Sequence, residues 1–193
     1  MRILFACTIC FLSLYSYSQQ TMTEEEKAFR KYEIIKDLLT YTKDFSHKNT
    51  LAQVNENVIF SFPTANNKIV SVCVSKNTSE TTGYIVYRFG TMDKVEFEFP
   101  KDTVNSFSQF TYSGYHRGGG IQNACMDIDN LRFENKGFRY EISDNYSCEE
   151  NIRVIQIDIY KPGSSNPISI KAKGKSTGSL YHLKDVVNVS DEL

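Results

Sequence analysis

The chain has no tryptophan, and only four of its 193 residues are proline and ten are glycine. So little proline and glycine excludes a collagen-like or low-complexity chain, which requires a large share of one or both. Twelve tyrosines and thirteen phenylalanines are present instead. Because these side chains suit pleated, half-buried surfaces, the composition favours β structure.

Long apolar runs are also absent, except for one over residues 3–14. This run follows the basic residue Arg2 and precedes the small-x-small step at residues 16–18, which is the pattern of a secretory signal peptide. About twelve apolar residues are too few to cross a hydrocarbon core of roughly 30 Å as a helix. We therefore expect a signal peptide over residues 1–18, cleavage before Gln19, and a periplasmic or secreted protein without a transmembrane segment after signal removal.

Neither sign of charge is in excess. The chain has 22 Lys+Arg and 23 Asp+Glu, and Arg2 is the only charged residue of the predicted signal, so 21 basic and 23 acidic residues remain, a formal charge of −2. A nucleic-acid-binding domain normally carries a basic stripe, so we expect no nucleic-acid partner. After cleavage the length suits one domain, and we predict a single secreted β-rich domain over residues 19–193.

Two of the five cysteines lie in the predicted signal, where Cys7 is a lipoprotein cysteine in the alternative interpretation. The remaining three, Cys73, Cys125 and Cys148, can form at most one internal disulfide. Cys73 lies in an apolar strand and is typical of a small core residue. We therefore expect a disulfide between Cys125 and Cys148, with three buried unpaired thiols as the alternative.

One helix is predicted, at about residues 23–45. Thr23 and Glu26 form a capping-box pattern, in which each side chain can satisfy a free backbone N–H at the start of the helix. Apolar and partly apolar residues then recur at steps of three and four: Phe29, Tyr32, Ile35, Leu39 and Thr42. We expect this stripe to pack on a sheet, while a free-standing helix that binds a partner is the alternative.

After Asn57 the apolar period changes to two. Residues 94–99 alternate clearly, which predicts Val95, Phe97 and Phe99 on the inner face. Strand patterns occur at residues 58–62, 69–74, 84–89, 94–99, 107–115, 122–133, 137–142, 152–160 and 167–173. Connections without helical patterns imply antiparallel pairing. The expected fold is therefore mainly β, an antiparallel sandwich or barrel-like sheet of about eight or nine strands with one N-terminal amphipathic helix.

The segment over residues 112–120 is the most unusual part of the chain. Three consecutive glycines, Gly118, Gly119 and Gly120, allow close approach of a ligand to the backbone. Beside them, His116 can carry a proton and Arg117 can hold an anion. Tyr112 and Tyr115 complete an aromatic, basic and glycine-rich loop. The alternative is a hairpin tip flanked by a solvated basic pair.

Arg88 is a further candidate for binding, because it shares a strand face with Tyr84 and Val86. An arginine near tyrosine suits cation–π packing or carboxylate recognition. The alternative is a structural role, in which its stem covers apolar surface and its head pairs with Glu96 or Glu98.

Asp127 and Asp129 lie two residues apart, so in a strand both carboxylates share a face with Cys125. Together with His116 they define an alternative function, a hydrolase that shares protons between these groups or uses a metal. Solvent-facing acids on an amphipathic strand are the other interpretation. The sequence contains no Cys-x-x-Cys or His-x-x-x-His spacing after the signal, no Gly-x-Ser-x-Gly and no phosphate-binding loop, so we predict no metal and no cofactor.

Three short motifs follow one another in the later part of the chain: Tyr87-Arg88-Phe89-Gly90, Glu96-Phe97-Glu98-Phe99-Pro100 and Tyr115-His116-Arg117-Gly118-Gly119-Gly120. In these the chain resembles a group of small secreted bacterial proteins without an assigned activity, from about Ile69 to the C-terminal region. The resemblance implies a bacterial periplasmic or secreted location and no catalytic residue. Over Ser113-Gly114-Tyr115 alone the chain is also similar to periplasmic lysozyme inhibitors, small β proteins that present such a loop to an enzyme cleft.

The leading functional hypothesis is a non-enzymatic, inhibitor-like binding module with a protein or glycan partner in the envelope. It rests on the residues of the 112–120 segment, which are of types common at binding surfaces. A third hypothesis is a structural envelope protein that docks a partner through its helix.

Overall fold

The computed structural model describes residues 22–43, 49–78, 82–120 and 123–193. The predicted signal peptide and its cleavage site lie outside the described residues. One α-helix precedes the strands: α1 (Glu24–Thr42). The strands are β1 (Glu56–Pro63), β2 (Ile69–Ser75), β3 (Ile85–Thr91), β4 (Lys94–Phe99), β5 (Thr111–Arg117), β6 (Met126–Asn135), β7 (Phe138–Ser147), β8 (Ile152–Tyr160), β9 (Ile168–Lys171), β10 (Thr177–Gly178) and β11 (Asn188–Val189). Two short 3-10 helices are also described, η2 (Ser106–Gln109) and η3 (Leu180–Leu183).

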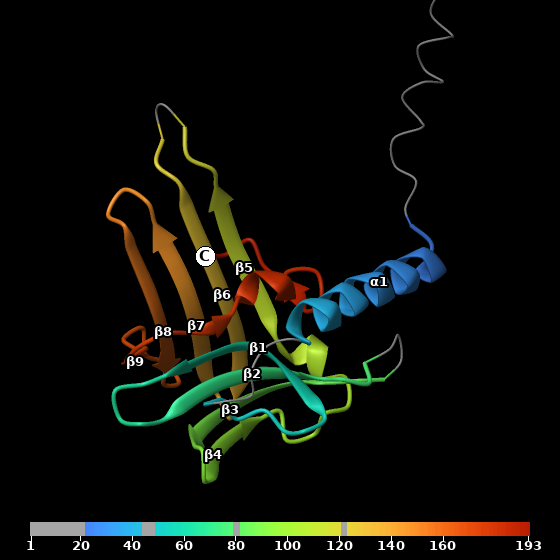
Figure 1. The fold of residues 1–193 in the computed structure, drawn as a ribbon, viewed down its shortest axis with the longest axis horizontal. Coiled ribbons are helices and arrows are strands. Elements are labelled where there is room, and N and C mark those ends of the chain that lie inside the picture. Colours follow the sequence, from blue (N-terminus) through green and yellow to red (C-terminus); the bar gives the residue numbers. More distant parts are fainter. Residues whose placement is uncertain (1–21, 44–48, 79–81, 121–122) are drawn as a thin grey trace, which may run out of the picture.

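The strands form two sheets, with the orders β10-β1-β2-β3-β4 and β11-β5-β6-β7-β8-β9 (Figure 1). The mainly β fold with one N-terminal helix is therefore confirmed. The expected number of strands is wrong, because eleven are described. The two-residue strands β10 and β11 come from a C-terminal region in which no alternating pattern marks a strand. Pairing is antiparallel except that β11 lies parallel to β5.

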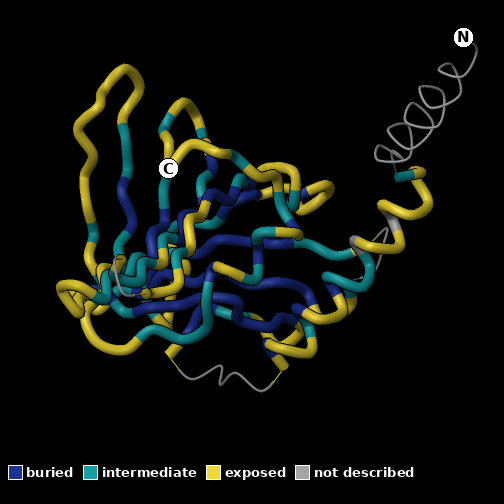
Figure 2. Tube along the Cα trace, turned by 90° about the horizontal axis from the view of Figure 1, so that it is seen from above, coloured by how far each residue is buried: buried dark blue, intermediate teal, exposed yellow. Residues whose placement is uncertain are grey.

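Side chains from both sheets, from α1 and from η3 meet in one hydrophobic core. Strand β2 is buried along its whole length, as its nearly continuous apolar sequence predicts. Figure 2 shows buried backbone running through the strands, with exposed residues gathered at the loops. On β4, Phe97 and Phe99 pack on this core, whereas Val95 is exposed. The expectation that Val95 faces inward is therefore wrong, since it lies near the β3–β4 turn, at the outer edge of the sheet.

Helix α1 begins as the capping box predicts: the Thr23 hydroxyl accepts from the Glu26 N–H at 3.2 Å, and Glu26 accepts from the Thr23 N–H at 2.8 Å. Only its second half packs on the core, through Ile35 and Leu38. The first half extends away from the sheets (Figure 1), and Phe29 is 64 % exposed. The prediction that the apolar stripe of this helix packs on a sheet is therefore wrong at Phe29.

No helix of the described ranges is both long and apolar enough to span a membrane.

The second sheet has the longer strands: β6 and β7 have ten residues each and β8 has nine, whereas β1, the longest strand of the first sheet, has eight. At the level of the core, Tyr112, Leu131, Ile142 and Ile157 lie side by side across β5 to β8 and are buried. Beyond this row the strands project past the first sheet (Figure 1). Side chains alternate along a strand, so positions two and four residues farther along return to the same face. This continuation of the core face carries the candidate site.

Candidate functional site

A cavity of about 1010 Å³ lies on the projecting part of the second sheet. Strands β5 to β8 provide one side of it, and the segment over residues 179–189 provides the other. Four carboxylates, two permanent cations, one histidine and three tyrosines line it. The core face of the sheet thus changes from apolar to polar where the first sheet no longer covers it.

His116 lies between two carboxylates. It is directly opposite Asp127 in the register of β5 and β6, and its Nδ1 atom is 3.2 Å from Asp127 Oδ1. Its Nε2 atom is 3.2 Å from both Asp129 Oδ1 and the Tyr112 hydroxyl. The Tyr112 hydroxyl donates a hydrogen bond to Asp129. These four groups form one hydrogen-bonded chain along which a proton can be exchanged.

Asp129 is the buried carboxylate of this chain. Burial raises the pKa of its carboxyl group above the ordinary value, and the nearby Asp144 carboxylate adds to the rise. The hydrogen bond from Tyr112 and the charge of His116 act in the opposite direction but do not cancel it. Burial and Asp129 also raise the pKa of Tyr112, so its hydroxyl remains a donor.

Two strands farther across the sheet, Arg153 forms a two-pronged ion pair with Asp144. Its Nε and Nη2 atoms each lie 2.6 Å from one carboxylate oxygen. This geometry is the strongest form of arginine–carboxylate recognition. Tyr146, on the same face of β7, donates from its hydroxyl to Asn151 at 3.1 Å.

The opposite wall is held in place by η3, whose Leu180 and Leu183 are fully buried in the core. The ring of Tyr181 lies nearly perpendicular to that of His116, with an interplanar angle of 83° and 4.9 Å between ring centroids. The Lys184 ammonium donates to the Tyr181 hydroxyl and lies 4.0 Å from the centroid of the same ring. Asp185 follows, exposed at the cavity.

Gly114 is required next to this chain of groups. A Cβ atom at this position would overlap the Tyr112 hydroxyl and ring. Any larger residue would therefore push Tyr112 away from Asp129 and His116.

The structure brings together some of the predicted site residues and separates others. Tyr112 and His116 line the cavity, as do Asp127 and Asp129 from the hydrolase alternative. Tyr115 and Arg117 lie on β5 at alternate positions, so their side chains are on the opposite face of the sheet. The Arg117 Nε atom donates to the carbonyl of Ala124 at 2.9 Å.

The three glycines, Gly118, Gly119 and Gly120, follow the end of β5. Added Cβ atoms at Gly118 and Gly120 would meet nothing within 4 Å, and none of the three lines the cavity.

Cys125 and Cys148, near this end of the sheet, are joined in a disulfide with a Cα–Cα distance of 5.2 Å. This is the pairing favoured from the sequence, and Cys73 is free and buried.

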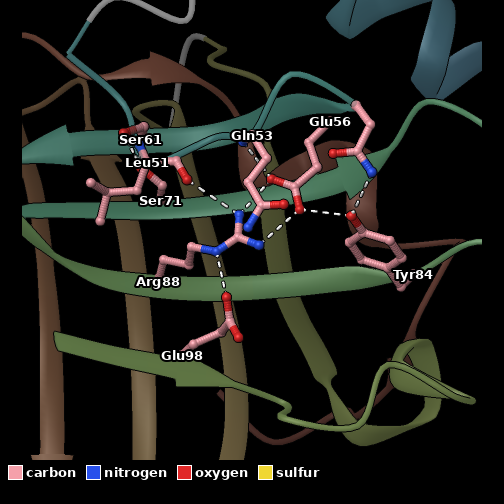
Figure 3. Close-up of polar contacts among 9 residues, drawn as sticks. Leu51, Gln53, Glu56, Ser61, Ser71, Tyr84, Arg88 and Glu98 are labelled. Atoms are coloured by element: carbon pink, nitrogen blue, oxygen red, sulfur yellow. Dashed lines mark hydrogen bonds and ion pairs between the residues drawn. The ribbon is translucent and has the colours of Figure 1, made fainter. Parts of the chain in front are cut away.

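Arg88 lies in a different place, among the polar contacts of the first sheet that Figure 3 shows. It alternates with Tyr87 along β3 and so shares the face of Val86, which clusters with Val58 and Cys73. Its guanidinium donates to Glu56, to Glu98 at 2.7 Å and to the carbonyl of Leu51 at 3.2 Å. Of the two carboxylates expected to pair with it, Glu98 does so and Glu96 does not. The structural role is therefore the one that its contacts support.

Sequence reasoning missed six charged or aromatic members of the cavity: Asp144, Arg153, Tyr146, Tyr181, Lys184 and Asp185. Asp144 and Arg153 could have been found by continuing the face of Asp129 across the sheet, which requires the registers of the β6–β7 and β7–β8 hairpins. Among the described residues, no cluster of three or more His, Cys, Asp and Glu side chains could hold a metal ion.

Comparison of the chain with protein-family models, with curated proteins and with solved structures finds no match. The chemistry of the cavity is therefore the basis on which a function can be proposed.

We predict that Asp129→Asn is at least as stable as the wild type at pH 7. The raised pKa means that the folded state binds this proton more tightly than the unfolded state, so the wild type loses stability as the pH rises from about 4 through the raised pKa. Asparagine still accepts the Tyr112 hydrogen bond and has no such loss. Urea unfolding between pH 4 and pH 8 measures the difference.

The control is Asp127→Asn, which also removes one carboxylate, but from a side chain that is 52 % exposed. If Asp129→Asn is less stable than the wild type at pH 7, and less stable by the same amount at pH 4, the pKa of Asp129 is not raised in the folded state.

Proposed function

We propose that this protein is a non-enzymatic binding module that works in the periplasm or outside the cell, and that its ligand enters the cavity around His116. One observation carries the proposal: Tyr112, Tyr146 and Tyr181 converge with charged groups of both signs on one cavity against the second sheet. Tyrosine and arginine are enriched where binding energy is concentrated, and binding cavities combine such rings with a few placed polar groups.

The proposed compartment has support from the disulfide. A disulfide such as that between Cys125 and Cys148 persists in oxidising surroundings and is rare in the cytosol.

The shared core of the two sheets supports a sandwich as the finer description of the fold.

The proposed partner is a protein or a glycan of the envelope. Carboxylates at Asp127 and Asp185 can accept hydrogen bonds from hydroxyl, amide or amino groups, while Tyr181 offers a ring face. The four carboxylates outnumber the two permanent cations, Arg153 and Lys184. That balance is unfavourable for nucleic acid, whose phosphates require a positive surface.

Hydrolysis is the second candidate, favoured by one specific observation: Asp127 and Asp129 both lie within hydrogen-bonding reach of His116, one at each ring nitrogen. A histidine oriented by one carboxylate and facing a second group with a raised pKa can act in general acid–base catalysis. The binding function remains the leading proposal because both His116 nitrogens already contact carboxylates.

The experiment is affinity capture from envelope and culture extracts with immobilised wild type, His116→Ala and Arg117→Ala, read by mass spectrometry for proteins and by a glycan array for carbohydrates. His116→Ala should retain clearly less of the partner than the wild type does, whereas Arg117→Ala, the next residue but on the opposite face, should retain as much as the wild type. Equal capture by all three proteins would place the binding surface elsewhere.

A separate assay with ester, glycoside and peptide substrates distinguishes the second candidate. Turnover by the wild type that His116→Ala abolishes would replace binding by catalysis as the function.

A further inference from the structure

Strand β5 has a partly open edge. Strand β6 pairs with all seven of its residues on one side. On the other side β11 pairs only with Thr111 and Tyr112. Within the described ranges no strand continues this pairing beyond Tyr112, and Figure 1 shows the upper part of β5 as the border of the sheet. Such an edge is a template for a further strand.

The hydrogen bonds of β11 show which backbone groups point to this edge. The N–H of Asn188 donates to the carbonyl of Phe110 at 3.2 Å, and the N–H of Ser190 donates to that of Tyr112 at 2.9 Å. Backbone groups alternate along a strand, so the next residues to face this edge are Gly114 and His116. Both are exposed, and neither makes a backbone hydrogen bond to another described segment on that side.

The same two residues line the cavity. A strand added along this edge would therefore place every second side chain beside the cavity opening, with its backbone hydrogen-bonded to the strand that carries His116. Strand β11, which lies parallel to β5 on the same edge, shows that this side of β5 accepts a strand.

The charges of the cavity indicate which side chain would enter. Arg153 is engaged by Asp144 and Lys184 by the Tyr181 hydroxyl, so both permanent cations have partners. The Asp127 carboxylate is 52 % exposed, and Asp185 is also exposed. A basic side chain would complement these carboxylates and could lie against a tyrosine ring.

We propose that an extended peptide segment of a partner protein adds to β5 as a further strand, bonded to the backbone of Gly114 and His116, with a lysine or arginine reaching Asp127 and Asp185. This inference rests on the proposed binding function and specifies the ligand as a peptide. In such recognition the backbone bonds provide affinity, and the pockets for alternate side chains provide specificity.

The test uses a library of seven-residue peptides, acetylated and amidated, with alternating positions drawn from threonine, valine, isoleucine and tyrosine. The central residue is lysine, glutamine or glutamate in three separate sublibraries. The wild type should retain lysine peptides at least tenfold more strongly than glutamate peptides. Asp185→Asn, which changes an exposed side chain of the cavity wall, should reduce this preference several-fold while leaving the glutamine peptides unaffected.

A pair of variants isolates the backbone contact. His116→Ala removes the imidazole but keeps the N–H that faces the edge, whereas His116→Pro removes both. Proline is tolerated on an edge strand where its missing N–H would face solvent. The best lysine peptide should bind His116→Pro at least tenfold more weakly than His116→Ala, with circular dichroism showing that both are folded.

Hydrogen exchange of the wild type provides a readout that needs no variant. Saturating peptide should slow exchange at the amides of Gly114 and His116, and leave Ser113 and Tyr115, whose amides point to β6, nearly unchanged. Equal retention of the three sublibraries, or no new protection at Gly114 and His116, would overturn the inference.

Two outcomes separate this inference from the proposed function. A glycan that binds the wild type and not His116→Ala, without any peptide binding, would overturn the peptide and keep the binding module. Self-association that protects Gly114 and His116 in the absence of peptide would assign the edge to a second copy of the chain and also overturn the inference.

Discussion

Replacement of Arg88 by methionine should lower the free energy of unfolding by about 3–5 kcal/mol, the usual result of breaking a buried ion pair by removing one partner. The side chain of Glu56 is fully buried and loses both guanidinium contacts in this variant. Two contacts remain to it, from the Gln53 N–H at 2.7 Å and the Tyr84 hydroxyl at 2.9 Å (Figure 3). Urea unfolding followed by far-ultraviolet circular dichroism measures the loss, since the chain has no tryptophan.

The double variant Arg88→Met/Glu56→Gln provides the control, because it removes the uncompensated charge and should recover most of the stability. If the double variant is as unstable as the single one, the loss comes from packing rather than from charge.

The same variant should also reverse a pH dependence. In the wild type, burial raises the pKa of Glu56, but the hydrogen bonds and charge of Arg88, with the bonds from Gln53 and Tyr84, outweigh it and leave the pKa lowered. Stability from this group is therefore present at neutral pH and is lost as the pH falls through the lowered pKa. Without Arg88 burial dominates and raises the pKa, so the deficit of the variant should shrink toward acid pH.

Replacement of Phe133 by alanine should cost about 3–5 kcal/mol, the range for removing a buried aromatic ring from a core. Phe133 is 3 % exposed, and its ring contacts aromatic rings from both sheets. The neighbouring rings are those of Tyr87, Phe97, Phe99, Phe110 and Tyr140, with centroid distances of 5.0, 6.5, 4.4, 5.4 and 4.7 Å. The cavity left by alanine lies between the sheets, so neither sheet can close it alone. Urea unfolding again measures the change.

Phe29→Ala is the matched control, since this ring on helix α1 is 64 % exposed, and its loss should change stability by no more than about 0.5 kcal/mol. Similar losses in the two variants would show that Phe133 is not the central contact between the sheets.

Local chemistry explains what could be predicted of the fold. The start of α1 follows from the Thr23–Glu26 capping box, and β8 (Ile152–Tyr160) follows from its alternation. The predicted strand over residues 107–115 is wrong in its first part, because η2 (Ser106–Gln109) forms there. Phe107 belongs to a residue type that is common in strands, so its identity alone favours a strand here. Asn105, just before η2, adopts φ 53°, and this left-handed conformation turns the chain.

The site could be predicted only as far as neighbours in sequence determine it. Asp127 and Asp129 share a face because of the strand period, and the same period separates Arg117 from His116. Arg88 and Glu56 are 32 residues apart, so their contact depends on how β1, β2 and β3 pair. The wall formed by Tyr181 and Lys184 depends on where η3 docks, which no local pattern specifies.

Cys73 gives the first sheet a built-in reporter. It is the free cysteine of the described part of the chain, and it is fully buried between β1 and β3. Burial raises the pKa of its thiol, so the group is unreactive while the sheet is closed. An alkylating reagent can modify it only during transient separation of these strands. The rate of modification under native conditions therefore measures how often the first sheet opens, independently of the disulfide-linked second sheet.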